Sequence, residues 1–234
     1  MTAEAVRVEV FTDVLCIWAY GGQARLDQLR RDFGDRVSLE HRFIPLFGAA
    51  RSRIERDWAG HGGYAGFNRH LREVASDWSH VRLHPELWLD NRPASSTLAH
   101  LYIKAAQRLE HEGRLADTAD RSSGRSTAEE YAWRIRCAFF ADNRDIGRPD
   151  ELERIAGELG LPPGALREEI AGGEAPAALH RDTEARDEYL VPGSPTLVFN
   201  AGRQRLYGNV GYRIIEANIR ELFRDPQYGE ASWC

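Results

Sequence analysis

The sequence has 234 residues with a formal net charge of −5, and 42% of the residues are apolar. A chain of this length and composition can bury a full core as one domain, with or without a large insertion, which excludes wholesale disorder. Its acidic balance and lack of a basic cluster exclude a nucleic-acid-binding face. No apolar run approaches the roughly 18 residues that a membrane helix needs.

The N-terminus and the cysteines indicate the compartment. Residues 1–11 lack the basic segment, apolar segment and cleavage site of a secretory signal. The three cysteines are odd in number and widely spaced, so we expect free thiols rather than a disulfide framework. These features predict a cytoplasmic protein.

The first 46 residues predict a β-α-β unit. Residues 6–11 alternate apolar and polar side chains as a strand does, although the apolar Phe11 breaks the pattern. Residues 16–33 have helical spacing, with Gly34 as a C-terminal cap, and residues 37–46 alternate again. Such a unit favours a parallel strand pair.

The middle of the chain, from about residue 64 to 189, shows only helical segments. Thr127 and Glu130 have the spacing of a capping box, and Asp150 is a candidate cap for the next helix. Helices are predicted within residues 64–78, 95–110, 127–143, 148–160, 162–173 and 174–190.

Strand character returns near the C-terminus. Residues 195–200 predict a strand that turns into a second strand at 205–209, and residues 212–223 predict an amphipathic helix. The predicted order is therefore β-α-β, a helical block, a hairpin and a helix.

Cys16 stands at the start of the first predicted helix. The free N–H groups and the positive dipole end at such a position stabilise a thiolate, which is the reactive form of cysteine. Cys16 can equally be a small buried hydrophobe, as free cysteines often are. Its position alone leaves both interpretations open.

The chain resembles the DsbA-like branch of the thioredoxin superfamily, near FrnE-like proteins, kappa-class glutathione transferases and 2-hydroxychromene-2-carboxylate isomerases. The resemblance runs from about Val6 to Phe223. The matching segments are "DVLCIWAY", "RIRCAFFADNRDI", "ELERIAGELGL", "VPGSPTLVFN" and "YGNVGY".

This resemblance implies an α/β, thioredoxin-like fold with a large all-helical insertion. Residues 1–48 and 180–234 would form the thioredoxin-like domain, and residues 49–179 the insertion. It also implies a cis peptide bond at Ser194–Pro195, in a loop that faces Cys16 across a cleft.

The active-site turn departs from the family's usual Cys-Pro-Trp-Cys, because it reads Cys16-Ile17-Trp18-Ala19. Without a second thiol at position 19, a disulfide inside the motif cannot form, which argues against a simple dithiol oxidase. Trp18, Ala19, Ser194 and Pro195 are expected to bind substrate. His100 is expected to contact substrate or donate a proton if its helix covers the cleft, and a satisfied surface or core histidine is the other interpretation.

The resemblance predicts a thiol–disulfide oxidoreductase or isomerase in which Cys16 forms a mixed disulfide that an external thiol resolves. A cofactor-independent isomerase or thiol-dependent transferase for a small aromatic or polyketide-like molecule stays open. So does a binding protein without catalytic activity.

No bound cofactor or metal is expected, although a low-molecular-weight thiol such as glutathione or mycothiol can serve as co-substrate. The expected partner is a disulfide or a small molecule, with neither nucleic acid nor membrane, and a homodimer stays open.

Cys234, the last residue, is a second candidate catalytic thiol. It follows a segment with little helix or strand signal, so a frayed tail with an incidental thiol is one interpretation. The adjacent Trp233 favours docking on an apolar surface. In that case Cys234 would resolve the mixed disulfide in place of the thiol that position 19 lacks.

Overall fold

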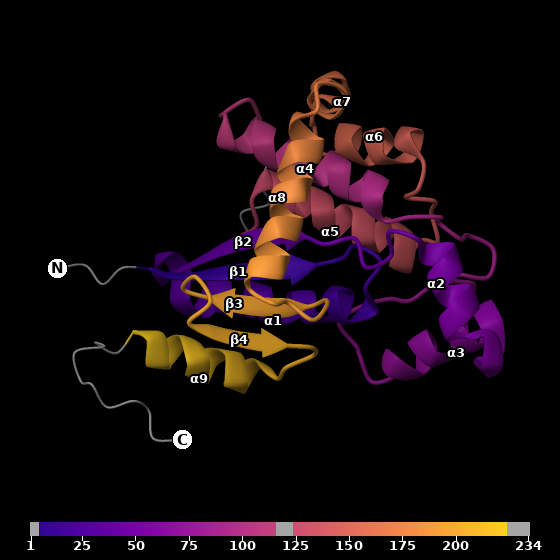
Figure 1. Cartoon of the computed structure of the whole chain (residues 1–234), viewed down its shortest axis with the longest axis horizontal. Coiled ribbons are helices and arrows are strands. Elements are labelled where there is room, and N and C mark those ends of the chain that lie inside the picture. The colour runs from indigo at the N-terminus through magenta and orange to yellow at the C-terminus, as the bar shows by residue number, and fades with distance from the viewer. Residues whose placement is uncertain (1–4, 116–123, 224–234) are drawn as a thin grey trace.

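The computed structural model describes residues 5–115 and 124–223. Its four strands are β1 (Val6–Thr12), β2 (Val37–Phe43), β3 (Thr196–Phe199) and β4 (Gln204–Tyr207). Its α-helices are α1 (Ile17–Phe33), α2 (Ala50–Asp57), α3 (Gly63–Val74), α4 (Thr97–His111), α5 (Thr127–Phe140), α6 (Pro149–Glu158), α7 (Pro163–Ala171), α8 (Glu174–Glu188) and α9 (Tyr212–Leu222). Figure 1 shows their arrangement around one sheet.

The sheet has the order β2-β1-β3-β4. Strands β1 and β2 are parallel, as the β-α-β prediction requires, and β1–β3 and β3–β4 are antiparallel. Val8 and Val10 of β1 are buried on one face, and Phe11 is buried in a second cluster with Val198. Phe11 therefore breaks the alternation because the central strand is covered on both faces.

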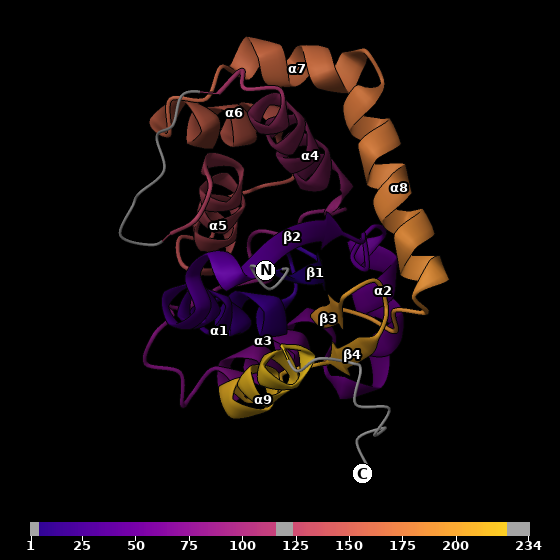
Figure 2. The same cartoon turned by 90° about the vertical axis from the view of Figure 1, so that its left-hand side faces the viewer.

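Helices α1 and α9 cover one face of the sheet, where they supply the buried helical residues of an apolar cluster with β1, β2 and β3. Helix α8 supplies Ala185 beside the cluster on the other face, together with Tyr189 just after its end. In Figures 1 and 2, helices α4–α7 gather on one side of the sheet and α9 lies on the opposite side. The N-terminal end of α1 is thereby held at the C-terminal end of the central strand β1.

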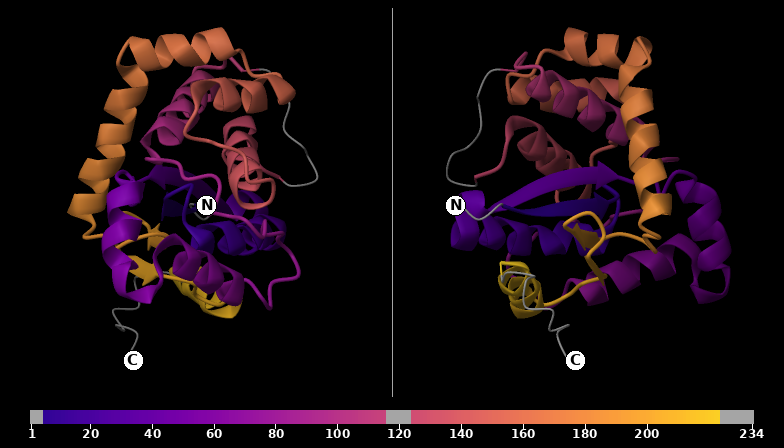
Figure 3. Two further views of the ribbon diagram at one scale, coloured as in Figure 1. Left: turned by 90° about the vertical axis from the view of Figure 1, so that its right-hand side faces the viewer. Right: turned by 60° about the vertical axis from the view of Figure 1, so that its left-hand side comes forward.

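The block between the two halves of the sheet is helical, which confirms the predicted fold class. Among the described residues between 64 and 180 there is no strand, and Leu87 and Asn91 form only an isolated bridge. Helix α2 was not predicted, because its sequence buries only Ala50 and Ile54 and carries little apolar periodicity. Figure 3 shows α2 and α3 beside the sheet, apart from α4–α7.

Two predicted helix starts are corrected. The capping box of α5 is formed by Ser126 and Glu129 rather than by Thr127 and Glu130, because Thr127 is already the first helical residue. Helix α6 begins at Pro149, whose fixed φ suits the first helical position, so Asp150 lies in the first turn and not at the cap.

The predicted boundary between residues 179 and 180 falls inside α8. This helix packs against α4 and α7, which belong to the helical block, and also against β2 of the sheet. The division into two domains stays a prediction.

Candidate active site

The turn that carries Cys16 is built by Asp13. Strand β1 ends at Thr12, and the Asp13 side chain turns the chain by accepting the N–H of Leu15 through Oδ1 at 2.8 Å. The backbone N–H of Cys16 then donates to the carbonyl of Asp13 at 3.1 Å. Cys16 becomes the N-cap of α1, as the sequence predicts.

The loop before β3 lies directly against this turn. The Cys16 thiol donates to the backbone carbonyl of Ser194 at 3.3 Å, and the Ser194 hydroxyl accepts the N–H of Asp13 at 3.0 Å. The Ser194–Pro195 peptide bond is cis. Segments almost 180 residues apart thus meet at the predicted cysteine.

Ala19 and Trp18 complete the turn on the α1 side. Ala19 is buried and lines a cavity of about 40 Å³ together with Pro195. Trp18 is half-buried and packs edge-on against Trp78, with ring centroids 5.6 Å apart. The first turn of α1 therefore offers an apolar wall and no second thiol.

The surroundings of Cys16 favour its neutral thiol over the thiolate. Burial raises the pKa of the Cys16 thiol, and the charge of Asp13 raises it further. Hydrogen bonds from Ser194 and from the backbone N–H groups of Ala19 and Trp18 act in the opposite direction, as expected at a helix start. Burial wins because the thiol is only 6% exposed, and desolvation penalises the thiolate more than these donors stabilise it.

His100 lies in the core beside the turn that carries Cys16, and it has no contact with solvent. It is fully buried, and its Nε2 accepts the N–H of Val14 at 3.1 Å and lies 3.7 Å from Oδ1 of Asp13. Burial lowers the pKa of His100 to about 4, so the ring is neutral at neutral pH. The expectation that His100 contacts substrate or donates a proton is therefore corrected, since the ring supports the turn that carries Cys16.

Sequence reasoning missed Asp13 and Ser96 as parts of the site. Asp13 is fully buried, and its Oδ2 accepts the N–H of Phe47 at 2.9 Å and the hydroxyl of Ser96 at 2.8 Å. Ser96 precedes α4 without capping it through its side chain, and the neighbouring Ser95 accepts the N–H of Thr97. The sequence signal that could have identified Asp13 is an acidic residue directly after a buried strand.

The DSBA-like thioredoxin domain model matches residues 7–220. The chain belongs to this family. No curated protein matches its sequence.

Three solved structures show the same fold. A probable DsbA oxidoreductase from Streptomyces coelicolor is 19% identical with a TM-score of 0.69, covering 98% of this chain and 92% of that one. The cytosolic disulfide reductase DsbM from Pseudomonas aeruginosa is 19% identical with a TM-score of 0.63, covering 92% and 99%. A 2-hydroxychromene-2-carboxylate isomerase is 17% identical with a TM-score of 0.61, covering 97% and 99%.

Of the other two cysteines of this DSBA-like protein, the structure describes one. Cys137 is a half-buried free thiol on α5, and burial raises its pKa to about 11. Cys234 lies outside the described residues.

A cavity of about 800 Å³ lies away from Cys16. It runs along β2 between α4 and α8, and no predicted site residue lines it. Several of its cations already have partners, such as Lys104 with Asp182 at 2.8 Å and Arg42 with Glu9 at 2.7 Å.

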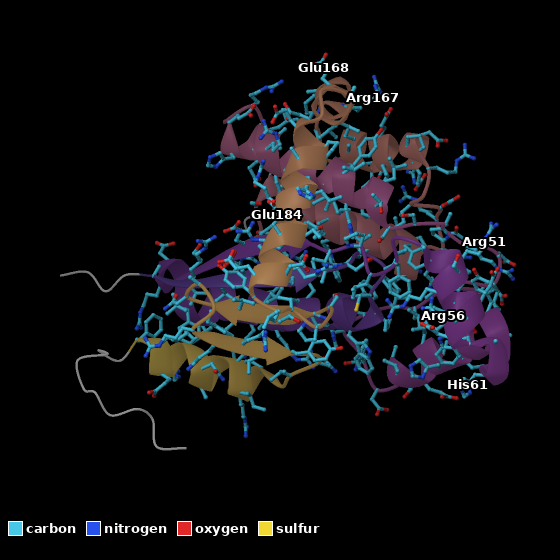
Figure 4. The ribbon with its side chains drawn as sticks, viewed as in Figure 1. Arg51, Arg56, His61, Arg167, Glu168 and Glu184 are labelled. Atoms are coloured by element: carbon cyan, nitrogen blue, oxygen red, sulfur yellow. The ribbon has the colours of Figure 1, made fainter. Side chains whose placement is uncertain are left out.

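No metal site accompanies the fold in the part of the chain that the structure describes. His61 and His70 pack against the Trp58 ring, and Figure 4 shows His61 at the outer end of the molecule, near Arg56 of α2. The described helices include none that is long and apolar enough to span a membrane.

Proposed function

We propose that this DSBA-like protein is a thiol–disulfide oxidoreductase or isomerase that works through Cys16 alone. The observation that carries the proposal is the contact of the Cys16 thiol with the Ser194 carbonyl, 3.3 Å away, beside a cis Ser194–Pro195 bond. Ala19 at the position of the family's second cysteine restricts the reaction to one protein thiol.

The reaction has two exchange steps. The Cys16 thiol first loses its proton to water, and the thiolate attacks one sulfur of a substrate disulfide. The new S–S bond joins Cys16 to the substrate, and the departing sulfur leaves as a thiolate that takes up a proton. An external thiolate then attacks the substrate sulfur of this mixed disulfide, which frees Cys16 and joins the substrate to the external thiol.

Deprotonation of Cys16 also changes the loop beside it. The Ser194 carbonyl accepts the Cys16 S–H in the resting protein. Once the thiolate forms, this carbonyl loses its donor and can accept an N–H from an extended substrate, as an added strand would supply. Trp18 would form the wall beside the substrate.

The external thiol would be a small one, such as glutathione or mycothiol, in the cytoplasm, where free thiols persist. One solved structure of similar fold carries the description of a cytosolic disulfide reductase with GSH, which supports this choice of co-substrate. The proposal also includes that the protein is FrnE-like and that it can form a homodimer.

Two further functions each have an observation in their favour. Ala19 and the fold of the 2-hydroxychromene-2-carboxylate isomerase favour a cofactor-independent isomerase or thiol-dependent transferase on a small aromatic or polyketide-like molecule. The raised pKa of the buried Cys16 thiol favours a binding protein that has lost redox activity.

One experiment separates the three. The pH dependence of Cys16 alkylation and the reduction of insulin disulfides with added glutathione or mycothiol are measured on wild type, Cys16→Ser and the matched control Cys137→Ser. Turnover that is lost in Cys16→Ser and kept in Cys137→Ser supports the proposal. A reactive Cys16 without disulfide turnover favours the small-molecule enzyme, and an unreactive Cys16 without turnover favours the binding protein.

Cys234 as a resolving thiol needs its own test. A disulfide with Cys16 requires Cα atoms within about 7 Å, so the C-terminal segment would have to reach the active site. Mass spectrometry of mildly oxidised wild type should then show a Cys16–Cys234 peptide that is missing in Cys234→Ala. Its absence from wild type, with unchanged turnover in Cys234→Ala, would leave Cys16 as the single protein thiol.

A further inference from the structure

Arg136 of α5 is a buried cation without an ion-pair partner among the described residues. Its side chain is 2% exposed, and Nη2 donates to the Thr12 hydroxyl at 2.6 Å while Nη1 lies 3.5 Å from Oε1 of Gln23. Both of these groups are neutral. Because an uncompensated buried charge is costly, such an arrangement calls for an anion nearby.

The third donor of Arg136 has no partner either, although the Glu129 carboxylate, which is already paired with Arg30, lines the same small cavity as Arg136. Nε has no hydrogen-bond partner, and Arg136 lines a cavity of about 10 Å³ with Gln107, whose buried Oε1 likewise has none. That volume corresponds to about one water molecule, which is also neutral. Hydrogen bonding can therefore satisfy the guanidinium without cancelling its charge.

Arg136 also lies beside residues of the active site. It lines the cavity of about 40 Å³ that Ala19 and Pro195 also line, and Thr12, to which it donates, ends the strand that leads to Cys16. The guanidinium is thus buried beside residues that flank Cys16.

The charged groups that interact with Arg136 include the Cys16 thiolate. Burial lowers the pKa of Arg136 to about 10, so the side chain stays charged at neutral pH. The charges of Cys16, Asp13 and Cys137 oppose this lowering, whereas the charge of Arg125 adds to it. Since opposite charges attract each other, a charged Arg136 favours the thiolate of Cys16 over the neutral thiol.

We propose that Arg136 is a positioning residue whose buried positive charge stabilises the Cys16 thiolate. The charge acts before the attack on the substrate disulfide, and again when resolution of the mixed disulfide returns Cys16 as a thiolate. It replaces part of the stabilisation that the thiolate loses through burial. This inference rests on Cys16 acting as the nucleophile of the proposed function.

The test is the alkylation rate of Cys16 by iodoacetamide between pH 6 and pH 10, followed by mass spectrometry of the Cys16 peptide. Arg136→Met should raise the apparent pKa of Cys16 by about one unit, which slows alkylation about tenfold below that pKa. Arg136→Lys, which keeps the charge, should restore most of the rate. Arg134→Met is the matched control, since Arg134 lies on the same helix with a side chain 57% exposed, and its profile should match wild type.

Thermal unfolding of each variant shows whether it is folded. If Arg136→Met does not fold, Arg136→Gln replaces it, because the amide keeps hydrogen-bonding capacity without charge. Equal pH profiles for the uncharged variant and Arg136→Lys would overturn the proposal. Alkylation needs no turnover, so this outcome is distinguishable from a wild-type protein that alkylates as expected but reduces no disulfide, which would overturn the proposed function instead.

Discussion

Lowering the pH from 7 to 5 should destabilise the fold through His100. The side chain is fully buried, and burial lowers its pKa to about 4, although the Asp13 carboxylate acts in the opposite direction. In the unfolded chain the imidazole has its ordinary pKa of 6.5. Between these two values the unfolded state binds more protons than the folded state, so stability is lost as the pH falls.

The size of the loss follows from the two pKa values. With 6.5 in the unfolded chain and about 4 in the fold, the free energy of unfolding falls by about 2 kcal/mol between pH 7 and pH 5. By pH 4 the loss approaches about 3 kcal/mol. Glu129 acts at lower pH, because His41 and Arg30 outweigh its burial and hold its pKa at about 2, against an ordinary value of 4.5.

Urea unfolding at pH 7, 6 and 5 measures this effect on wild type and on His100→Gln, whose amide oxygen can still accept the N–H of Val14. The variant should be less sensitive to pH by about 2 kcal/mol over this range. His180→Gln is the control, since the His180 side chain is 72% exposed and should leave the pH dependence unchanged. An equal loss in wild type and His100→Gln would refute the assignment of His100 as a neutral buried support.

Two further substitutions test the packing around the site by urea unfolding. In Gly21→Ala the new Cβ would lie 2.3 Å from the Trp78 ring, so the variant should lose about 1–3 kcal/mol. Gly157→Ala meets open space on α6 and should gain about 0.5–1 kcal/mol; a Gly21→Ala protein as stable as this control would contradict the packing. Asp182→Asn leaves Lys104 buried without its carboxylate at 2.8 Å and should cost about 3–5 kcal/mol, and a loss below about 1 kcal/mol would show that the pair is solvated.

Local sequence patterns determined most of the elements. Alternation in residues 6–11 and 37–46 predicted β1 and β2, which pair in parallel, and helical spacing predicted α3–α9. Helix α2 was not predicted from the sequence. Only two of its residues are buried, so its sequence lacks the apolar periodicity that indicates a helix. The cysteine at the start of α1 and the cis bond before Pro195 were also predicted, the second through the family resemblance.

Only the tertiary structure decided the electrostatics of the site. The sequence places Cys16 at a helix N-terminus, which lowers a thiol pKa, but burial by segments distant in the chain raises it. His100 and Arg136 come from α4 and α5, and no spacing in the sequence shows that both lie beneath the turn at Asp13. Helix and strand formation depend on neighbours within a few residues, whereas desolvation and Coulomb interactions depend on every group that packing brings close, whatever its position in the chain.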